Sequence, residues 1–269
     1  GIQVWDAASG RALRLLVTDW VGYLAFSPDG RYLAAADLQG LRLWELATGK
    51  VVLRHKAHEK MRGSYGSSFA SCLSFAPDGR SLATGHVDST VLIWNLVPPA
   101  DPSTTVDLSR SWDALAGSDA VKAYAASWRL SDAPTQALPF FRKRLQPAVP
   151  ASAERTRRLL DDLDSDEFSR REAATARLRE LGDRVAGTLR KTLKANPTLE
   201  TRRRVEALLK ALEESPSGEM LRAIRATAVL ERIGTPEVRE MLKGLADGDP
   251  EARLTQAAHA SWKRLTKER

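Results

Sequence analysis

Cysteine is nearly absent from this sequence: Cys72 is the only one in 269 residues. A single thiol cannot close an internal disulfide or build a cysteine-rich zinc site, and its scarcity fits a reducing compartment. The sequence also lacks an uninterrupted run of about 18 apolar residues, which a membrane-spanning helix needs. We therefore expect a cytoplasmic protein without a disulfide framework or a membrane span.

Aromatic residues make up only 6% of the chain, and charge of one sign is not concentrated anywhere. The net charge of +7 comes from 41 basic and 34 acidic residues that are spread along the sequence. Nucleic-acid binding requires clustered positive charge, so nucleic acid is an unlikely partner. The apolar fraction of 43% is sufficient for folded cores, and at about 150 residues per domain the length predicts one large domain or two ordinary ones.

The first hundred residues contain repeated strand signals. Trp5, Trp44 and Trp94 each end an apolar run whose alternation predicts a strand with one buried face. A Pro-Asp-Gly sequence recurs at residues 28–30 and 77–79, each time between two apolar runs. Proline and glycine favour the dihedral angles of a tight turn, so each copy predicts a β-hairpin.

Residues 25–34, 43–50 and 75–83 together resemble WD40 repeats. The resemblance implies a partial β-propeller over residues 1–97, with two full blades and part of a third. The sequence after Leu96 is proline-rich, so no fourth strand is expected there. The fold class is a β + α multidomain protein, because the rest of the chain has a different periodicity.

The WD40 resemblance also implies a hydrogen-bonded structural tetrad in the last blade, made by His58, Thr84, Asp88 and Trp94. A histidine, a hydroxyl and a carboxylate also suggest a catalytic triad. The predicted hydroxyl lies within a strand rather than at a nucleophile elbow, so the structural interpretation is preferred. The preceding blade keeps only Trp44 of this set, and packing alone should hold it.

After a proline-rich linker at 98–110, residues 111–269 have a helical period. Residues 174–182 match residues 226–234, 52 positions further on, and three units are predicted near 118–164, 165–214 and 217–268. This part resembles HEAT or armadillo-like α-helical repeats, which implies a solenoid. A compact bundle of the same helices is the alternative.

Local signals predict where several helices begin. Pro197, Pro236 and Pro250 each follow a residue that can cap a helix, and proline is favoured at the first helical position. Asp164 and Glu167 have the spacing of a capping box.

The remaining residues of interest have structural interpretations. Cys72 is expected to be small and buried. Dense aromatic residues at the start of the helical part are expected to pack the first helical unit against the edge of the sheets: Trp112, Tyr124, Trp128, Phe140 and Phe141. One group of arginines is a candidate site for an anion or a partner, although a solvated helix face is the simpler interpretation: Arg155, Arg157, Arg158, Arg202, Arg203 and Arg204.

These patterns favour a non-enzymatic scaffold for protein–protein interactions. The sequence indicates no catalytic residue, no cofactor and no metal ligand, and the partners are other proteins. The strand already under way at Gly1 suggests the C-terminal portion of a longer chain, whose missing N-terminal blades would also be a partner. The architecture resembles large bacterial signalling proteins. A sensor or regulatory tail behind a sigma-factor or Ser/Thr kinase module is therefore one alternative, and nucleic-acid binding through the arginine-rich face is another.

Overall fold

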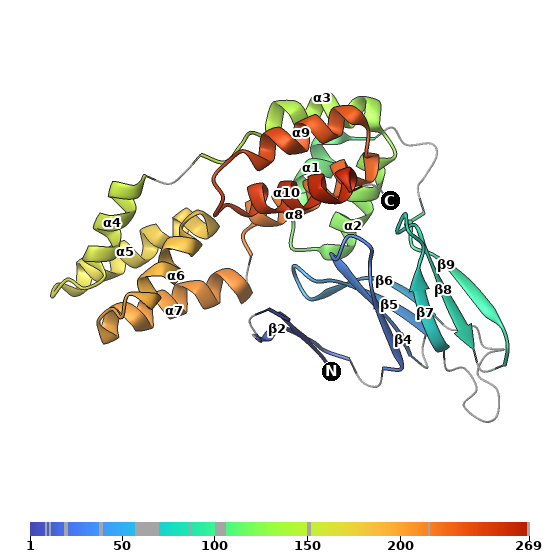
Figure 1. Cartoon of the computed structure of the whole chain (residues 1–269), viewed down its shortest axis with the longest axis horizontal. Helices are drawn as coiled ribbons and strands as arrows, with labels where there is room; N and C mark the ends of the chain where they lie inside the picture. Colours follow the sequence, from blue (N-terminus) through green and yellow to red (C-terminus); the bar gives the residue numbers. More distant parts are fainter. Residues whose placement is uncertain are drawn as a thin grey trace. The chain divides into compact units, whose positions relative to one another are not determined.

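The computed structural model describes residues 1–267 except 9, 11, 19–20, 38–39, 57–69, 87, 100–105, 150–151 and 215. The chain divides into two compact units, Gly1–Arg129 and Leu130–Arg269. Strands belong to the first unit, and most helices belong to the second (Figure 1).

The strands of the first unit form three antiparallel sheets, in the chain orders β1-β2, β3-β4-β5-β6 and β7-β8-β9. Within each sheet, each strand pairs with its neighbour in sequence, so the connections inside a sheet are hairpins. The bounds are β1 Ile2–Trp5, β2 Ala12–Leu16, β3 Tyr23–Phe26, β4 Tyr32–Asp37, β5 Gly40–Glu45, β6 Lys50–Lys56, β7 Ala70–Phe75, β8 Ser81–His86 and β9 Val91–Asn95.

The two Pro-Asp-Gly sequences form the predicted hairpin turns. Gly30 N–H donates to Ser27 O over 2.8 Å, and Gly79 N–H donates to Ala76 O over 2.9 Å. Gly30 and Gly79 have φ angles of 68° and 67°, which a residue with a Cβ rarely adopts. The turns therefore fix the register of β3 with β4 and of β7 with β8.

Within the described residues, one of the two predicted full blades has four strands, and the other has three. β9 is the edge of its sheet, and the chain continues from Leu96 towards the helices. Among the described residues no further strand follows β9, so four strands are present only in the β3–β6 sheet.

The three sheets pack face to face through apolar side chains. The β1-β2 sheet meets one face of the β3–β6 sheet in a cluster around Leu16, Leu33 and Trp44. The β7–β9 sheet meets the opposite face in a second cluster, which includes Leu43 and Leu82. The central sheet is therefore covered on both faces, and each outer sheet is covered on one.

Helices α1 (Leu108–Ala116) and α2 (Ala120–Ser131) follow β9, and aromatic residues of α2 join the second cluster. The Tyr124 hydroxyl donates to Leu96 O over 2.8 Å, and its ring lies edge-on to Tyr32 at 5.3 Å between centroids. Trp128 is buried in the same cluster, with the Arg80 guanidinium 5.0 Å from its ring centroid. The expected packing of Tyr124 and Trp128 on the sheets is confirmed.

The second unit is helical throughout its regular structure. Helix bounds are α3 Pro134–Arg144, α4 Ala153–Asp162, α5 Phe168–Leu181, η2 Gly182–Val185, α6 Ala186–Lys194, α7 Leu199–Glu214, α8 Gly218–Ile233, α9 Pro236–Ala246 and α10 Arg253–Thr266. A bilayer crossing needs a long apolar helix, and the described residues contain none.

The helices of the second unit pack in two groups (Figure 1). α4, α5, α6 and α7 share a core that includes Leu163, Leu178 and Val205. α10 packs on α8 and α9, while α8 also contacts α3. Asp249 N–H donates to Ala148 O over 2.7 Å, which ties the turn before α10 to the segment after α3. Helices far apart in sequence are thus neighbours.

The predicted helix starts are only partly correct. Thr235 caps α9, and Pro236 is its first residue, as expected. α7 begins at Leu199 rather than Pro197 because the Thr198 hydroxyl accepts from Thr201 N–H and provides the cap. α10 begins at Arg253 rather than Pro250.

The predicted capping box is wrong. Glu167 precedes α5 as its cap residue but makes no side-chain capping bond. The Asp164 carboxylate instead accepts from the Thr198 hydroxyl over 2.5 Å, so it bonds to the start of α7 rather than to α5.

Candidate interaction surfaces

A polar group inside the β7–β9 sheet contains two members of the predicted tetrad. Trp94 Nε1–H donates to Thr84 Oγ1 over 2.8 Å, and Thr84 is buried. Thr84 Oγ1 also lies 2.9 Å from His86 Nε2. Because the hydroxyl accepts from the indole, its own proton is available to the imidazole.

Asp88, the third described member, bonds locally within the turn between β8 and β9. Its carboxylate accepts from the hydroxyl and the backbone N–H of Thr90, at 2.7 Å and 3.0 Å. These bonds, together with the nearby His86, hold the pKa of Asp88 below its ordinary value. His58 lies outside the described residues, so the tetrad as a whole stays a prediction. His86 was not included in the predicted group, although its spacing of two from Thr84 in one strand places both side chains on one face of the sheet.

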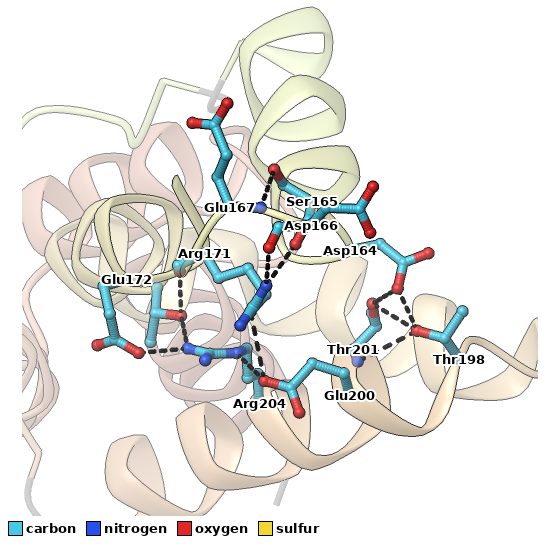
Figure 2. Close-up of polar contacts among 11 residues, drawn as sticks. Asp164, Ser165, Asp166, Glu167, Arg171, Glu172, Thr198, Glu200, Thr201 and Arg204 are labelled. Atoms are coloured by element: carbon cyan, nitrogen blue, oxygen red, sulfur yellow. Dashed lines mark hydrogen bonds and ion pairs between the residues drawn. The ribbon is translucent and has the colours of Figure 1, made fainter. Parts of the chain in front are cut away.

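Arg204, one of the candidate arginines, is mostly buried between helices α5 and α7. Figure 2 shows Arg204 of α7 between Glu172 and Glu200. Arg204 Nη1 also donates to Thr175 Oγ1 over 3.1 Å. Arg204 Nη1 lies 2.7 Å from Glu172 Oε1, and Arg204 Nε lies 2.7 Å from Glu200 Oε1. The hydrogen bonds that Arg204 donates to these carboxylates, Glu172 first, raise its pKa, and only 15% of its side chain is exposed. Arg204 therefore joins α5 to α7.

The polar contacts around Arg204 continue towards the connection between α4 and α5 (Figure 2). Arg171 Nη1 donates to Ser165 O over 2.6 Å and to Asp166 O over 2.9 Å. Arg171 Nε also lies 3.7 Å from Glu200 Oε1. These bonds from Arg171 to two backbone carbonyls fix the connection against α5.

Two of the other candidate arginines have partners within the chain, and four of them are exposed. Arg158 pairs with Glu154 one turn away, and Arg202 Nη2 donates to Asn196 Oδ1 over 2.9 Å. Arg155, Arg157 and Arg203 are exposed. Anion or partner binding by this group stays a prediction, and Arg158 is as exposed as these three.

The outer face of the β1-β2 sheet is apolar and open to solvent. Leu13, Leu15 and Val17 alternate along β2 and just beyond it, and Leu15 is 60% exposed. Trp5 at the end of β1 is exposed as well. We call these four residues the β2 face.

The β7–β9 sheet leaves a second apolar face open. Val91 and Ile93 on β9 are 66% and 69% exposed, and they pair with Gly85 and Ala83 of β8. Cys72 of β7 pairs with Gly85 and is exposed, so the expectation of a buried cysteine is wrong. The cysteine is exposed because nothing among the described residues covers this side of the sheet. We call Cys72, Val91 and Ile93 the β9 face.

The sequence already carried a signal for the β9 face. Residues 91–94 are four consecutive apolar residues, and a strand that is apolar on both sides is typical of a sheet covered on both faces. The structure covers the side that bears Trp94 and leaves the other side open.

Comparison with known proteins supports the repeat assignment. The family described as WD domain, G-beta repeat matches residues 14–45 and 55–95. The small ribosomal subunit protein RACK1 of Brassica napus is 30% identical over 108 residues, which cover 35% of this chain and 33% of that protein. WD repeat-containing protein 18 of Homo sapiens is 34% identical over 106 residues, covering 38% of this chain and 23% of its own length. The small ribosomal subunit protein RACK1z of Arabidopsis thaliana is 26% identical over 107 residues.

The first unit therefore contains WD40 repeats. The chain spans one third or less of the length of these curated relatives, at 33% for both RACK1 proteins and 23% for WD repeat-containing protein 18.

Proposed function

We propose that this chain is a non-enzymatic scaffold for protein–protein interactions. The observation that supports it is the pair of open apolar faces on the WD40 sheets. Monomeric proteins rarely expose large contiguous apolar patches, and such patches are typical of interaction sites. The residues of both faces are also uncharged, which is typical of the buried centre of an interface.

A further sheet of the same kind fits these faces. In a longer chain, additional N-terminal blades would cover the β2 face or the β9 face and extend the arrangement into a propeller. The antiparallel sheets packed face to face support this proposal, because each outer sheet already uses one side for such a contact.

The helical unit offers a second surface for the scaffold. We propose that α2–α10 form HEAT-like repeats of three helices, as the matching residues of the sequence suggest. Three helices fall within each proposed unit, which supports this interpretation. α3, in the first repeat, packs on α8, in the third repeat, so the three repeats do not simply stack in consecutive order.

The scaffold proposal is tested by comparative affinity capture from an extract of the source cells. The immobilised chain is compared with a double variant, Leu15→Lys with Ile93→Lys, in which both open faces are charged. We expect a set of proteins that the wild type retains and the double variant loses. Val149→Lys changes an exposed apolar residue outside both faces and is the matched control. Identical capture by all three proteins would refute a scaffold role for these faces.

A further inference from the structure

The two junctions between the sheets share one construction. At the first junction, Trp44 of β5 lies with Ile2 and Val4 of β1 in one apolar cluster. At the second junction, Trp94 of β9 packs on the cluster that contains Leu41 and Leu43 of β5. In both, a face bearing the strand-end tryptophan meets a face bearing two aliphatic residues spaced two apart.

The outer sheets present these same two surfaces without a partner among the described residues. Trp5 corresponds to Trp44 and Trp94 as a strand-end tryptophan, and it lies exposed on the β2 face. Val91 and Ile93 correspond to Leu41 and Leu43 in their position before the tryptophan, and they lie exposed on the β9 face. The chain thus exposes one half of the junction at each end of its row of sheets.

We infer that the partner of these faces is a second copy of this chain, with the β9 face of one copy docked on the β2 face of the next. This inference rests on the proposed scaffold role and names its partner. The two halves of the junction differ, so the contact is heterologous rather than two-fold symmetric, and it leaves a free face at each end of a pair. Copies therefore add in one direction until a ring closes or the concentration limits growth.

Two single substitutions test the inference in the purified chain of 269 residues. Ile93→Lys charges only the β9 face, and Leu15→Lys charges only the β2 face. Both side chains are mostly exposed in one copy, so the lysine is solvated there and the fold is retained, as far-UV circular dichroism would check. At the contact the lysine would be buried without a partner, which should weaken association by at least about tenfold.

Mass is measured by sedimentation equilibrium over a range of concentrations. The wild type and the Val149→Lys control should rise above the monomer mass of 29.6 kDa as concentration increases. Each single variant should stay at the monomer mass. An equimolar mixture of the two should reach twice that mass and stop, because Leu15→Lys keeps an intact β9 face and Ile93→Lys keeps an intact β2 face.

Three outcomes would overturn the inference. A wild type that stays monomeric at every concentration would show that the partner of these faces is not a second copy. Single variants that associate like the wild type would place the contact elsewhere. A mixture that stays monomeric would exclude the pairing of β9 face with β2 face. If the purified chain stays monomeric while face-dependent capture from extract persists, only the second-copy inference fails. If that capture also disappears, the scaffold role fails as well.

Discussion

The hydroxyl of Thr84 is the feature of the β7–β9 sheet whose removal has the most predictable consequence. Thr84→Val keeps the shape of the side chain and deletes the oxygen that bonds Trp94 Nε1 and His86 Nε2, at 2.8 Å and 2.9 Å. Thr84 is buried, so no water replaces the oxygen directly. A hydrogen bond lost under such conditions costs about 1–3 kcal/mol of stability.

Native-state hydrogen exchange measures this cost within the first unit, because it reports on individual strands. If the amides of β8 and β9 exchange through unfolding of their sheet, a loss of about 1–3 kcal/mol accelerates their exchange roughly 5- to 160-fold. The amides of α8 and α10, in the other unit, should exchange at wild-type rates. Thr84→Ser retains the hydroxyl and should recover most of the protection.

Two results would refute this reasoning. Exchange in β8 and β9 within about twofold of the wild type in Thr84→Val would mean that the hydroxyl contributes little net stability. Equal acceleration in Thr84→Ser would mean that the methyl group, rather than the hydrogen bonds, stabilises the sheet.

Other predictions concern single side chains. Arg204→Met should lower the free energy of unfolding in urea titrations by only about 1–2 kcal/mol, because the two carboxylates that it leaves unpaired are half-exposed to solvent. Arg203→Met, at an exposed position, is the control and should change this free energy by less than about 0.5 kcal/mol. The lowered pKa of Asp88 means that its charged form stabilises the fold above the ordinary value of 3.8, and that this contribution is lost as pH falls through the folded-state pKa. Thermal unfolding of Asp88→Asn should therefore depend less on pH in the acid range than that of the wild type. Gly234→Ala should lower the melting temperature because Gly234 ends α8 at φ 64°, whereas Gly244→Ala, inside α9 with open space at the Cβ position, should raise it. Each change corresponds to roughly 1 kcal/mol.

The hairpins were predictable from sequence because their signals are local. A Pro-Asp-Gly turn fixes the dihedral angles of consecutive residues, and the structure places Gly30 and Gly79 at the positive φ that this turn needs. The helix start at Pro236 was predictable for the same reason, since Thr235 directly before it provides the cap. At α7 the competing Thr198, one position after proline, caps the helix instead.

The arginine group shows where local reasoning ends. Arg202, Arg203 and Arg204 are adjacent in sequence, and their shared charge suggested one surface. Helical geometry separates them, because Thr201 and Val205 are buried and Arg204 lies beside that buried stripe. Its partner Glu172 is 32 positions away in sequence, so the pairing depends on how α5 meets α7. Only the three-dimensional structure shows that Arg204 is not part of the candidate surface site.

The exposure of the two open faces could not be predicted from local sequence either, but here the structure exposes residues that the pattern suggested were buried. Alternation predicts which residues of a strand share a side, but whether that side is covered depends on a neighbour. Leu41 and Leu43 are buried because the β7–β9 sheet lies against them, whereas Val91 and Ile93, in the corresponding strand positions, are exposed. The same pattern therefore forms a core in one sheet and a free surface in the next. Burying a large aliphatic side chain is favourable by about 1.5–3 kcal/mol. Each open face is therefore stabilised by any partner that reproduces the junction. The outer sheet at the opposite end of this chain carries the surface that does so.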